Sequence, residues 1–361
     1  MGRVVDGKYE IEEILGVGGM GMVFKARRTL IGDHVALKVL FPRFLESKLQ
    51  RQLFRDEAVA AARLSHPNCV TVFDADISAE TDVAYIAMEL LQGRPFKALL
   101  KDRAPMPVDE VLPLVVQICD GLAAAHAARV VHRDLKPDNI FLQTLSGGRT
   151  RVKLVDFGIA AMLDADPRDE QRRLLGTLRY MAPEQARNEA VDARADLYAL
   201  GVVIYEALTR KRATGKTLSA VIHDPVVPPN EFLEEAKRLP TPLEALLMAL
   251  LEKHPDDRPA SALAVKESVL ALTRATGLTT APPRVPAPIS LQGLMPPKGM
   301  SIPSSPPGPI APEAIAVPPE PTPAAAPDLG AAPSKKILLV GLAIALAVGV
   351  VGALVFSRFG G

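Results

Sequence analysis

Two short segments contain the side chains best suited to chemistry. Residues 132–139 read His-Arg-Asp-Leu-Lys-Pro-Asp-Asn, and Asp156 opens an Asp-Phe-Gly triplet. Asn139 and Asp156 carry oxygen atoms of the kind that bind Mg²⁺ or Mn²⁺. Asp134 is placed to accept a hydroxyl proton, and Lys136 to neutralise charge on a group being transferred. Phosphoryl transfer needs these parts together, because it uses a metal at the phosphate oxygens and a carboxylate beside the nucleophile.

A glycine-rich segment near the N-terminus is suited to holding a polyphosphate. It reads Gly16-Val17-Gly18-Gly19-Met20-Gly21-Met22-Val23. Without side chains the backbone can fold closely over phosphate groups. Alone, the pattern also fits a glycine-rich hairpin or a dinucleotide-binding loop. The latter expects a helix after the glycines, whereas residues 22–26 have the pattern of a strand.

Lys38 follows the glycine segment at the end of the apolar run Val-Ala-Leu-Lys. An isolated lysine there is usually a strand residue that faces solvent. After a glycine-rich loop, it is well placed to hold the α- and β-phosphates of ATP. Glu57, on the next predicted helix, is its expected ion-pair partner, while the adjacent Asp56 should face another side of that helix.

With these motifs, residues from about 8 to about 275 resemble the Hanks-type protein kinases, specifically the bacterial Ser/Thr kinases with Gly-Gly-Met-Gly in the first loop. The resemblance implies that Met88 is the gatekeeper and that Glu89 and Leu91 bind adenine through their backbone. It extends the expected ATP site to the following set: Gly16, Val17, Gly18, Gly19, Met20, Gly21, Val23, Ala36, Lys38, Glu57, Met88, Glu89 and Leu91.

The resemblance also implies which hydroxyl is phosphorylated and which residues are structural. Lys136 and Thr177, the latter in Gly-Thr before the Ala-Pro-Glu of 182–184, match residues that face the catalytic aspartate in Ser/Thr kinases. The expected catalytic set is therefore Asp134, Lys136, Lys38 and Thr177. Glu184, Arg258 and Asp196 resemble residues that stabilise the family's fold.

The remaining pattern predicts an α+β fold with two lobes. Short apolar strands are expected at 9–15, 22–26, 34–40, 70–75 and 83–89, with a helix at 47–64. After residue 95 the pattern becomes helical, most clearly at 108–128 and 195–208. We therefore expect a kinase domain at 8–275, with a β-rich lobe at about 8–90 and an α-rich lobe at about 91–275.

The C-terminal part has a different composition. Residues 276–334 form a predicted disordered linker, because its proline-rich sequence without aromatic residues cannot bury enough apolar surface to fold. Residues 337–356 are uncharged and long enough to span a bilayer as a helix. Lys335 and Lys336 favour a cytoplasmic kinase domain in the cell membrane and an extracytoplasmic tail at 357–361.

Small residues recur every four positions in the predicted span, at Gly341, Ala345, Gly349 and Ala353. This spacing lets two helices approach closely, so a homodimer through the span is one interpretation. Alanine and glycine are also simply common in such helices. The linker prolines are interpreted as a spacer, with docking to an aromatic groove as the alternative.

Two segments depart from the family pattern. Residues 159–176 contain no Ser, Thr or Tyr but several acids, of which Asp169 or Glu170 is a candidate partner for Arg133 in place of a phosphate. A solvated charged loop is the alternative. Arg210-Lys211-Arg212 occupies the place of a turn common in bacterial relatives, either as an attraction for acidic substrates or as plain surface.

The overall composition narrows the function further. With 42 basic and 41 acidic residues the chain gives no indication of nucleic-acid binding. Two distant cysteines suggest reduced, packed thiols and no zinc site. The expected function is a membrane-anchored, non-specific Ser/Thr protein kinase acting on proteins. A pseudokinase scaffold is the alternative, but it would have lost catalytic residues, whereas Lys38, Asp134, Asn139 and Asp156 are all present. A kinase-fold enzyme acting on a small molecule would lack the Gly-Thr and Ala-Pro-Glu elements, and this chain has both.

Overall fold

The computed structural model describes residues 2–79, 81–157 and 178–277. They belong to a compact unit that spans Met1–Pro296, and a second unit, Pro297–Gly361, lies wholly outside them. Several predictions therefore fall outside the described residues: Thr177 and the acids of 159–176, most of the linker, the membrane span and the tail. No helix within the described ranges is long and apolar enough to cross a membrane.

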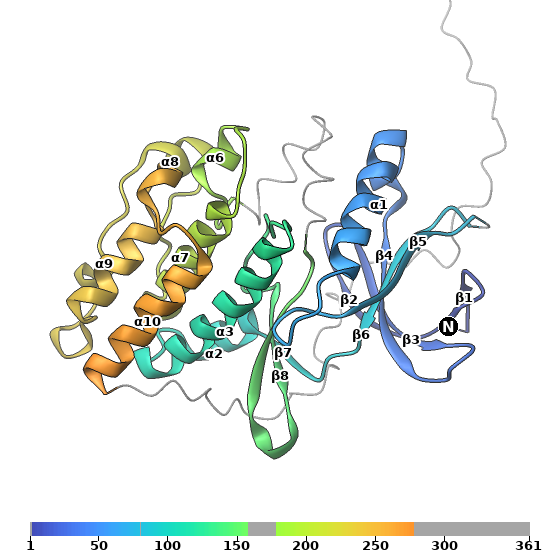
Figure 1. Ribbon diagram of the computed structural model, residues 1–361, viewed down its shortest axis with the longest axis horizontal. Helices are drawn as coiled ribbons and strands as arrows, with labels where there is room; N and C mark the ends of the chain where they lie inside the picture. Colours follow the sequence, from blue (N-terminus) through green and yellow to red (C-terminus); the bar gives the residue numbers. More distant parts are fainter. Residues whose placement is uncertain (1, 80, 158–177, 278–361) are drawn as a thin grey trace, which may run out of the picture. The chain divides into compact units, whose positions relative to one another are not determined.

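The first part of the chain forms an antiparallel sheet with strand order β1-β2-β3-β4-β6-β5 (Figure 1). Its strands are β1 (Val4–Val5), β2 (Tyr9–Val17), β3 (Gly21–Arg28), β4 (His34–Leu40), β5 (Val72–Ile77) and β6 (Ala84–Glu89). In register, Lys38 of β4 pairs with Val23 of β3 and with Ile86 of β6. The phosphate-binding candidate thus lies in the middle of the sheet.

Helix α1 (Lys48–Ala62) packs against this sheet. Ser47 begins it with a reciprocal cap, in which its hydroxyl accepts from the backbone N–H of Gln50 and its N–H donates to the Gln50 side chain. Phe54 and Ala58 lie one turn apart and are buried. This spacing directs one face of the helix to the sheet, as the sequence pattern predicts.

A smaller sheet and a group of helices follow. The sheet consists of β7 (Gly93–Pro95), β8 (Ile140–Thr144) and β9 (Thr150–Leu154). The helices are α2 (Phe96–Arg103), α3 (Val108–Ala127), α6 (Pro183–Ala186), α7 (Arg194–Thr209), α8 (Leu218–His223), α9 (Thr241–Leu250) and α10 (Ala262–Thr276). Helix α3 packs on α10, α7 and β9, so it is central to this part.

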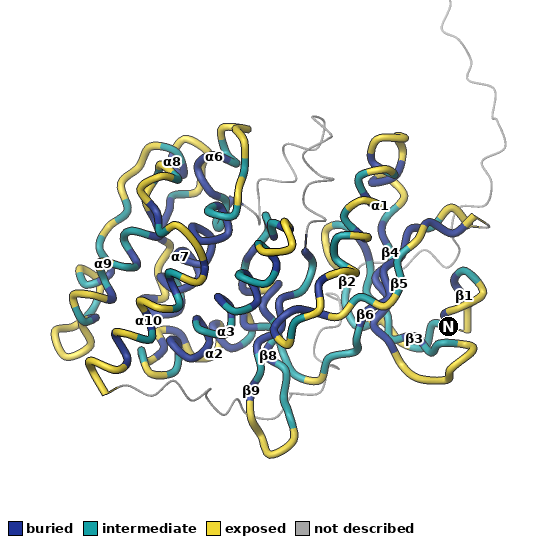
Figure 2. The backbone as a smooth tube through the Cα atoms, in the orientation of Figure 1, coloured by how far each residue is buried: buried dark blue, intermediate teal, exposed yellow. Residues whose placement is uncertain are grey.

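Buried residues occur both in the six-stranded sheet and in the helical part (Figure 2). Helix α7 is buried along nearly its whole length, with Tyr198 and Tyr205 fully inaccessible. A helix that is apolar on all sides must be enclosed by others. Both cysteines are free and buried, and burial raises the pKa of each thiol to about 12. They are therefore neutral packing residues, as predicted.

The predicted two-lobed α+β fold is confirmed over these residues, and most elements lie where expected. The clearest shift concerns the strand predicted at 70–75, which runs from Val72 to Ile77. The reason is a switch of partner, because the N–H of Val70 donates to Leu154 O on β9, 2.9 Å away. The first residues of the apolar run therefore connect the two sheets instead of extending one.

Candidate active site

The loop between α3 and β8 holds its polar side chains against one another. Lys136 Nζ lies 2.6 Å from Asp134 Oδ2. The Asn139 amide donates to the carbonyl oxygen of Asp134 at 2.8 Å and to its Oδ2 at 3.0 Å. Asp134 and Lys136 are largely buried yet retain accessible side-chain surface. The proposed base thus has a fixed orientation and a cation beside it.

Asp196 of α7 fixes the backbone of this loop. Its carboxylate accepts from the N–H of His132 at 2.8 Å and of Arg133 at 2.9 Å, and from His126 Nε2 at 2.8 Å. Asp196 is only 1% exposed. Arg133 has a φ of +62°, a left-handed conformation that non-glycine residues rarely adopt. Two backbone bonds to one buried carboxylate compensate for that strain.

Lys38 and Asp156 form the second half of the site. Lys38 Nζ lies 2.8 Å from Asp156 Oδ1, and the lysine side chain is 7% exposed. Burial alone would raise the pKa of Asp156, but the charge and hydrogen bond of Lys38 outweigh it and lower the pKa. The carboxylate is therefore ionised at neutral pH.

A short backbone connection joins the two halves. The N–H of Val155, next to Asp156, donates to Asn139 O at 3.0 Å. His132 Nε2 lies 3.0 Å from the carbonyl oxygen of Val155, and its ring packs on Phe157 with centroids 4.8 Å apart. Through these contacts the structure brings together residues from four separate positions in the sequence, namely Lys38, Asp134, Asn139 and Asp156.

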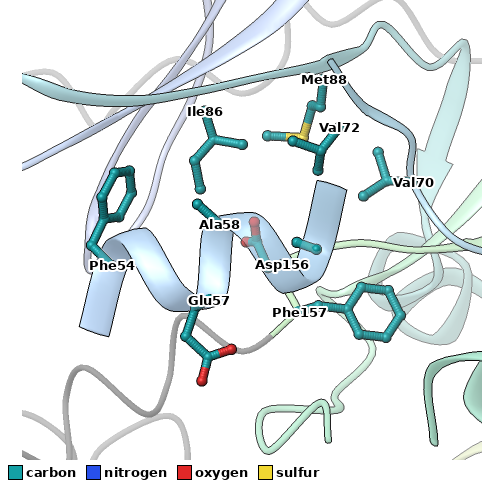
Figure 3. Close-up of a pocket in the computed structure, with 10 residues that line it drawn as sticks. Phe54, Glu57, Ala58, Val70, Val72, Ile86, Met88, Asp156 and Phe157 are labelled. Atoms are coloured by element: carbon teal, nitrogen blue, oxygen red, sulfur yellow. The ribbon is translucent and has the colours of Figure 1, made fainter. Parts of the chain in front are cut away.

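The expected Lys38–Glu57 ion pair is absent from this conformation, so this part of the prediction is corrected. Lys38 contacts Asp156 instead. Figure 3 shows the Glu57 carboxylate pointing away from Ile86 and Met88. Burial raises the pKa of Glu57, and the nearby charge of Arg133 only partly opposes this. The physical reason is that the Asp156 carboxylate, 2.8 Å from Lys38 Nζ, takes the place expected for Glu57.

An apolar pocket lies between α1 and the sheet (Figure 3). Side chains from both lobes line it, including Phe54, Ala58, Val72, Ile86, Met88 and Phe157. Met88, the predicted gatekeeper, pairs in register with Ala36 and is 8% exposed. Ala36 and Met88, both expected at the nucleotide site, therefore lie side by side on the neighbouring strands β4 and β6.

The glycine segment forms the turn between β2 and β3. Gly16 and Val17 pair with Val23 and Met22, so the segment is a hairpin followed by a strand, which excludes the dinucleotide-loop alternative. A Cβ on Gly21 would lie 2.1 Å from Val39 O, so this glycine is required by the close approach of β4. Nothing surrounds a Cβ at Gly19 within 4 Å, which leaves that side open for a ligand.

Met20 and the hinge residues complete the expected nucleotide site. The carbonyl oxygen of Met20 accepts from Phe41, and that of Gly19 from Arg43 Nη2 at 2.7 Å. The N–H of Glu89 donates to Thr71 O, and Leu91 follows two residues later. Gly18 donates to Gly21 O at 2.8 Å, which closes the turn.

Comparison with known proteins identifies the domain. The family model described as "Protein kinase domain" matches residues 9–270. The chain belongs to the protein kinase family. The chain is 37% identical over 284 residues to the serine/threonine-protein kinase pkn3 of Myxococcus xanthus, a match that covers 76% of this chain and 51% of that protein. The chain thus spans about half of that relative.

Two further similarities agree. The chain is 35% identical over 298 residues to the serine/threonine-protein kinase PknA of Mycobacterium tuberculosis, a match that covers 80% of this chain and 66% of PknA. The crystal structure of the Mycobacterium tuberculosis PknI kinase domain matches with a TM-score of 0.60 and 29% identity, covering 75% of this chain and 98% of that one. The predicted resemblance to bacterial Hanks-type Ser/Thr kinase domains is confirmed.

Kinases of this family use ATP with a divalent metal, and Asn139 and Asp156 fit that requirement. Their oxygens are hard donors, and the Asp156 side chain is 32% exposed, so a ligand can reach it. The described part of the chain has no group of three or more His, Cys, Asp or Glu that would hold a metal alone. Mg²⁺ usually takes one or two carboxylates and completes its shell with phosphate and water oxygens.

Two further contacts bear on the predicted structural residues of the kinase domain. Arg258 Nη1 and Nη2 each lie 2.7 Å from a Glu184 oxygen, with both side chains almost fully buried. Gln185 Nε2 donates to Arg133 O at 2.9 Å, which connects this segment to the catalytic loop. The Glu184–Arg258 pair is thus placed to stabilise the fold next to the site.

Sequence reasoning missed Lys153 of β9. Its ammonium lies 2.6 Å from Glu89 Oε1 and 3.1 Å from Cys69 O, and the side chain is 6% exposed. The same Glu89 oxygen accepts from the N–H of Thr71 at 2.8 Å. The signal was present, because Lys153 is the one charge in the apolar run 152–155, but a sequence does not reveal its partner.

Proposed function

We propose that this chain is a bacterial Ser/Thr protein kinase that transfers the γ-phosphoryl group of ATP to Ser or Thr hydroxyls of proteins. The carrying observation is that Lys38, Asp134, Asn139 and Asp156 meet in one site through the contacts described above. Membership of the protein kinase family adds the reaction type.

The residues divide the work of in-line transfer. Asp134 orients the acceptor hydroxyl and takes its proton, while Lys136, 2.6 Å away, offsets negative charge on the transferring group. Lys38 binds the α- and β-phosphates. Asn139 and Asp156 would hold Mg²⁺, or Mn²⁺ in its place, and the bound metal supplies charge neutralisation at the phosphate oxygens. The glycine turn covers the nucleotide and excludes water.

Selection of Ser and Thr rests on Lys136 and Thr177. Lys136 lies beside the proposed base, with its Nζ 2.6 Å from Asp134 Oδ2. Thr177 lies outside the described residues, and its role follows from the family motif alone. Adenine binding is assigned to the backbone of Glu89 and Leu91, with Ala36, Met88, Val17 and Val23 as the apolar surroundings.

The test is the substitution Asp134→Asn in the full-length chain. Loss of the proton acceptor should lower autophosphorylation and transfer to a protein substrate about 10²–10⁴-fold, with unfolding temperature and ATP binding retained. Asp102→Asn, which changes an exposed carboxylate paired with Arg94, is the matched control. Full activity in the Asp134 variant would refute the assignment. ATP binding without any transfer by the unmodified chain would instead favour the scaffold alternative.

We also propose that the chain is anchored in the cell membrane by residues 337–356, with the kinase domain in the cytoplasm. The support is the uncharged composition of that segment and the preceding Lys335 and Lys336. Replacing Ala345 and Gly349 with arginine should move the chain from the membrane fraction to the supernatant after alkaline extraction. Retention of this variant in the membrane would contradict the proposal.

A homodimer through the same segment is proposed from its small residues at four-residue spacing. Gly341→Ile and Gly349→Ile should reduce crosslinking between membrane-embedded chains, whereas Leu342→Ile should not. Equal crosslinking in all three variants would contradict a role for the small residues. A dimer would raise the effective concentration of one kinase domain near another.

A further inference from the structure

The segment that follows Thr177 along the chain forms one border of the catalytic loop, and its charges are arranged unusually. Arg179 Nη2 lies 2.7 Å from Glu206 Oε1 of α7. The hydroxyl of Tyr180 bonds the other oxygen of the same carboxylate. Burial and this hydrogen bond both raise the pKa of Tyr180, so the phenol remains a neutral donor. Both carboxylate oxygens of Glu206 thus already bind groups of the same chain.

The second acidic residue at this border, Asp138, also has an ion-pair partner in the chain. Asp138 belongs to the catalytic loop, and Lys97 Nζ of α2 lies 2.7 Å from its Oδ1. The charge of Asp138 also raises the pKa of Tyr180, the residue whose hydroxyl bonds Glu206. A basic residue of a substrate would therefore have to displace an internal cation at either position. Such an exchange gives little net gain, because one ion pair is lost for each one formed.

Cations on the next segment have no such partners within the described ranges of the chain. Arg210, Lys211 and Arg212 follow the end of α7, one turn beyond Glu206, and are exposed, as is Lys216. Thr214 Oγ1 donates to Arg179 O at 3.4 Å, which places this segment beside Arg179. Lys211 lies over the Phe232 ring, 5.8 Å from its centroid. Among the residues that the structure describes, no carboxylate forms an ion pair with these four cations.

We propose that this surface, formed by Arg210, Lys211, Arg212 and Lys216, selects protein substrates with acidic residues beside the phosphorylated Ser or Thr. The inference rests on the proposed kinase function and adds the substrate class to it. The acids at the border are neutralised by Arg179 and Lys97, while no carboxylate of the described residues pairs with the neighbouring cations. Charge complementarity of this kind governs selectivity and the rate of encounter more than it adds raw affinity.

The test compares three peptides with one acceptor threonine and acidic, neutral or basic flanking residues. The full-length chain should phosphorylate the acidic peptide with a kcat/KM about tenfold above that of the basic peptide, mainly through KM. The variant Arg210→Gln/Lys211→Gln/Arg212→Gln should reduce this ratio to about threefold or less. Raising the salt concentration should likewise reduce the ratio, because exposed charges are screened.

A matched control removes three exposed cations elsewhere: Lys48→Gln at the start of α1, Arg149→Gln before β9 and Arg274→Gln near the end of α10. This control should retain the unmodified ratio. Because the ratio is internal to each variant, a general loss of activity does not affect it. An unchanged ratio in the Arg210–Arg212 variant, or equal use of the three peptides by the unmodified chain, would overturn the inference. Failure to phosphorylate any peptide would instead count against the kinase function itself.

Discussion

The two halves of the active site differ in how firmly they are built. Asp134, Lys136 and Asn139 contact one another directly, and the buried Asp196 fixes the loop that carries them. Lys38 contacts Asp156, but its expected partner Glu57 points elsewhere. The contacts of the loop half are therefore complete, whereas those of the half that depends on α1 are not.

The difference follows from what each half rests upon. The catalytic loop is bonded to α7, which is enclosed by other helices. Helix α1 packs on the sheet along one face and borders the apolar pocket beneath Met88. A helix with a pocket on its inner side can shift at smaller cost than a loop held by backbone hydrogen bonds. Three substitutions test this contrast, in order of their expected effect on the free energy of unfolding.

The largest effect is expected for Asp196→Ala. It leaves the N–H groups of His132 and Arg133 without their acceptor inside the protein, so the free energy of unfolding should fall by about 3–5 kcal/mol. Chemical denaturation of the full-length chain measures it. Asp196→Asn retains one acceptor oxygen and should cost less than the alanine variant. A cost below about 1 kcal/mol for Asp196→Ala would show that the loop does not depend on this carboxylate.

An intermediate effect is expected for Lys38→Met. Loss of the cation raises the pKa of Asp156, which Lys38 now lowers. A lowered folded-state pKa stabilises the protein above the unfolded-state value, near 3.9, and that contribution disappears as the pH falls through the folded-state value. The free energy of unfolding of the variant should therefore be about 1–2 kcal/mol lower at neutral pH, a modest loss because Asp156 is partly exposed. The difference between the variant and the unmodified chain should disappear below about pH 4. Denaturation at several pH values measures it; a gap independent of pH would contradict the coupling.

The same contrast explains which parts of the site could be predicted from the sequence. Asp134, Lys136 and Asn139 lie within six residues, so their contacts follow from one local loop and the motif predicts them. The strands around Lys38 were predicted because alternation and turn residues are local signals. The partner of Lys38 was predicted wrongly for this conformation, since it depends on the position of α1 relative to the sheet.

Ion pairs between residues far apart in the sequence could not be predicted either. Lys153 and Glu89 are 64 residues apart, and their ion pair arises because the hinge and β9 meet in the folded chain. Arg179 and Glu206 come together in the same way. No spacing rule indicates such pairs, because the packing of two distant elements determines them. Family resemblance identified Glu184 and Arg258 as residues that stabilise the fold, which residue types alone would not have given.

The smallest effect on stability, and the sharpest test of the contrast, is expected for Glu57→Gln. Burial raises the pKa of Glu57, so its ionised form is unfavourable in the folded chain. A raised folded-state pKa leaves stability intact at low pH and reduces it as the pH rises above the ordinary glutamate value, near 4.3. The variant should therefore match or exceed the unmodified chain in stability at pH 7–8, with the difference vanishing near pH 4.

Activity separates the two interpretations of this carboxylate. If α1 moves during the reaction so that Glu57 reaches Lys38, Glu57→Gln should lower kcat by about tenfold or more while the nucleotide-free chain loses no stability. Asp56→Asn, which changes the adjacent exposed carboxylate bonded to Gln52, is the matched control and should leave kcat unaltered. An unaltered kcat in the Glu57 variant would mean that the Lys38–Asp156 contact seen here is sufficient. A marked loss of stability would mean instead that Glu57 already has a stabilising partner in the folded chain, which would argue against a movement of α1 that brings Glu57 to Lys38.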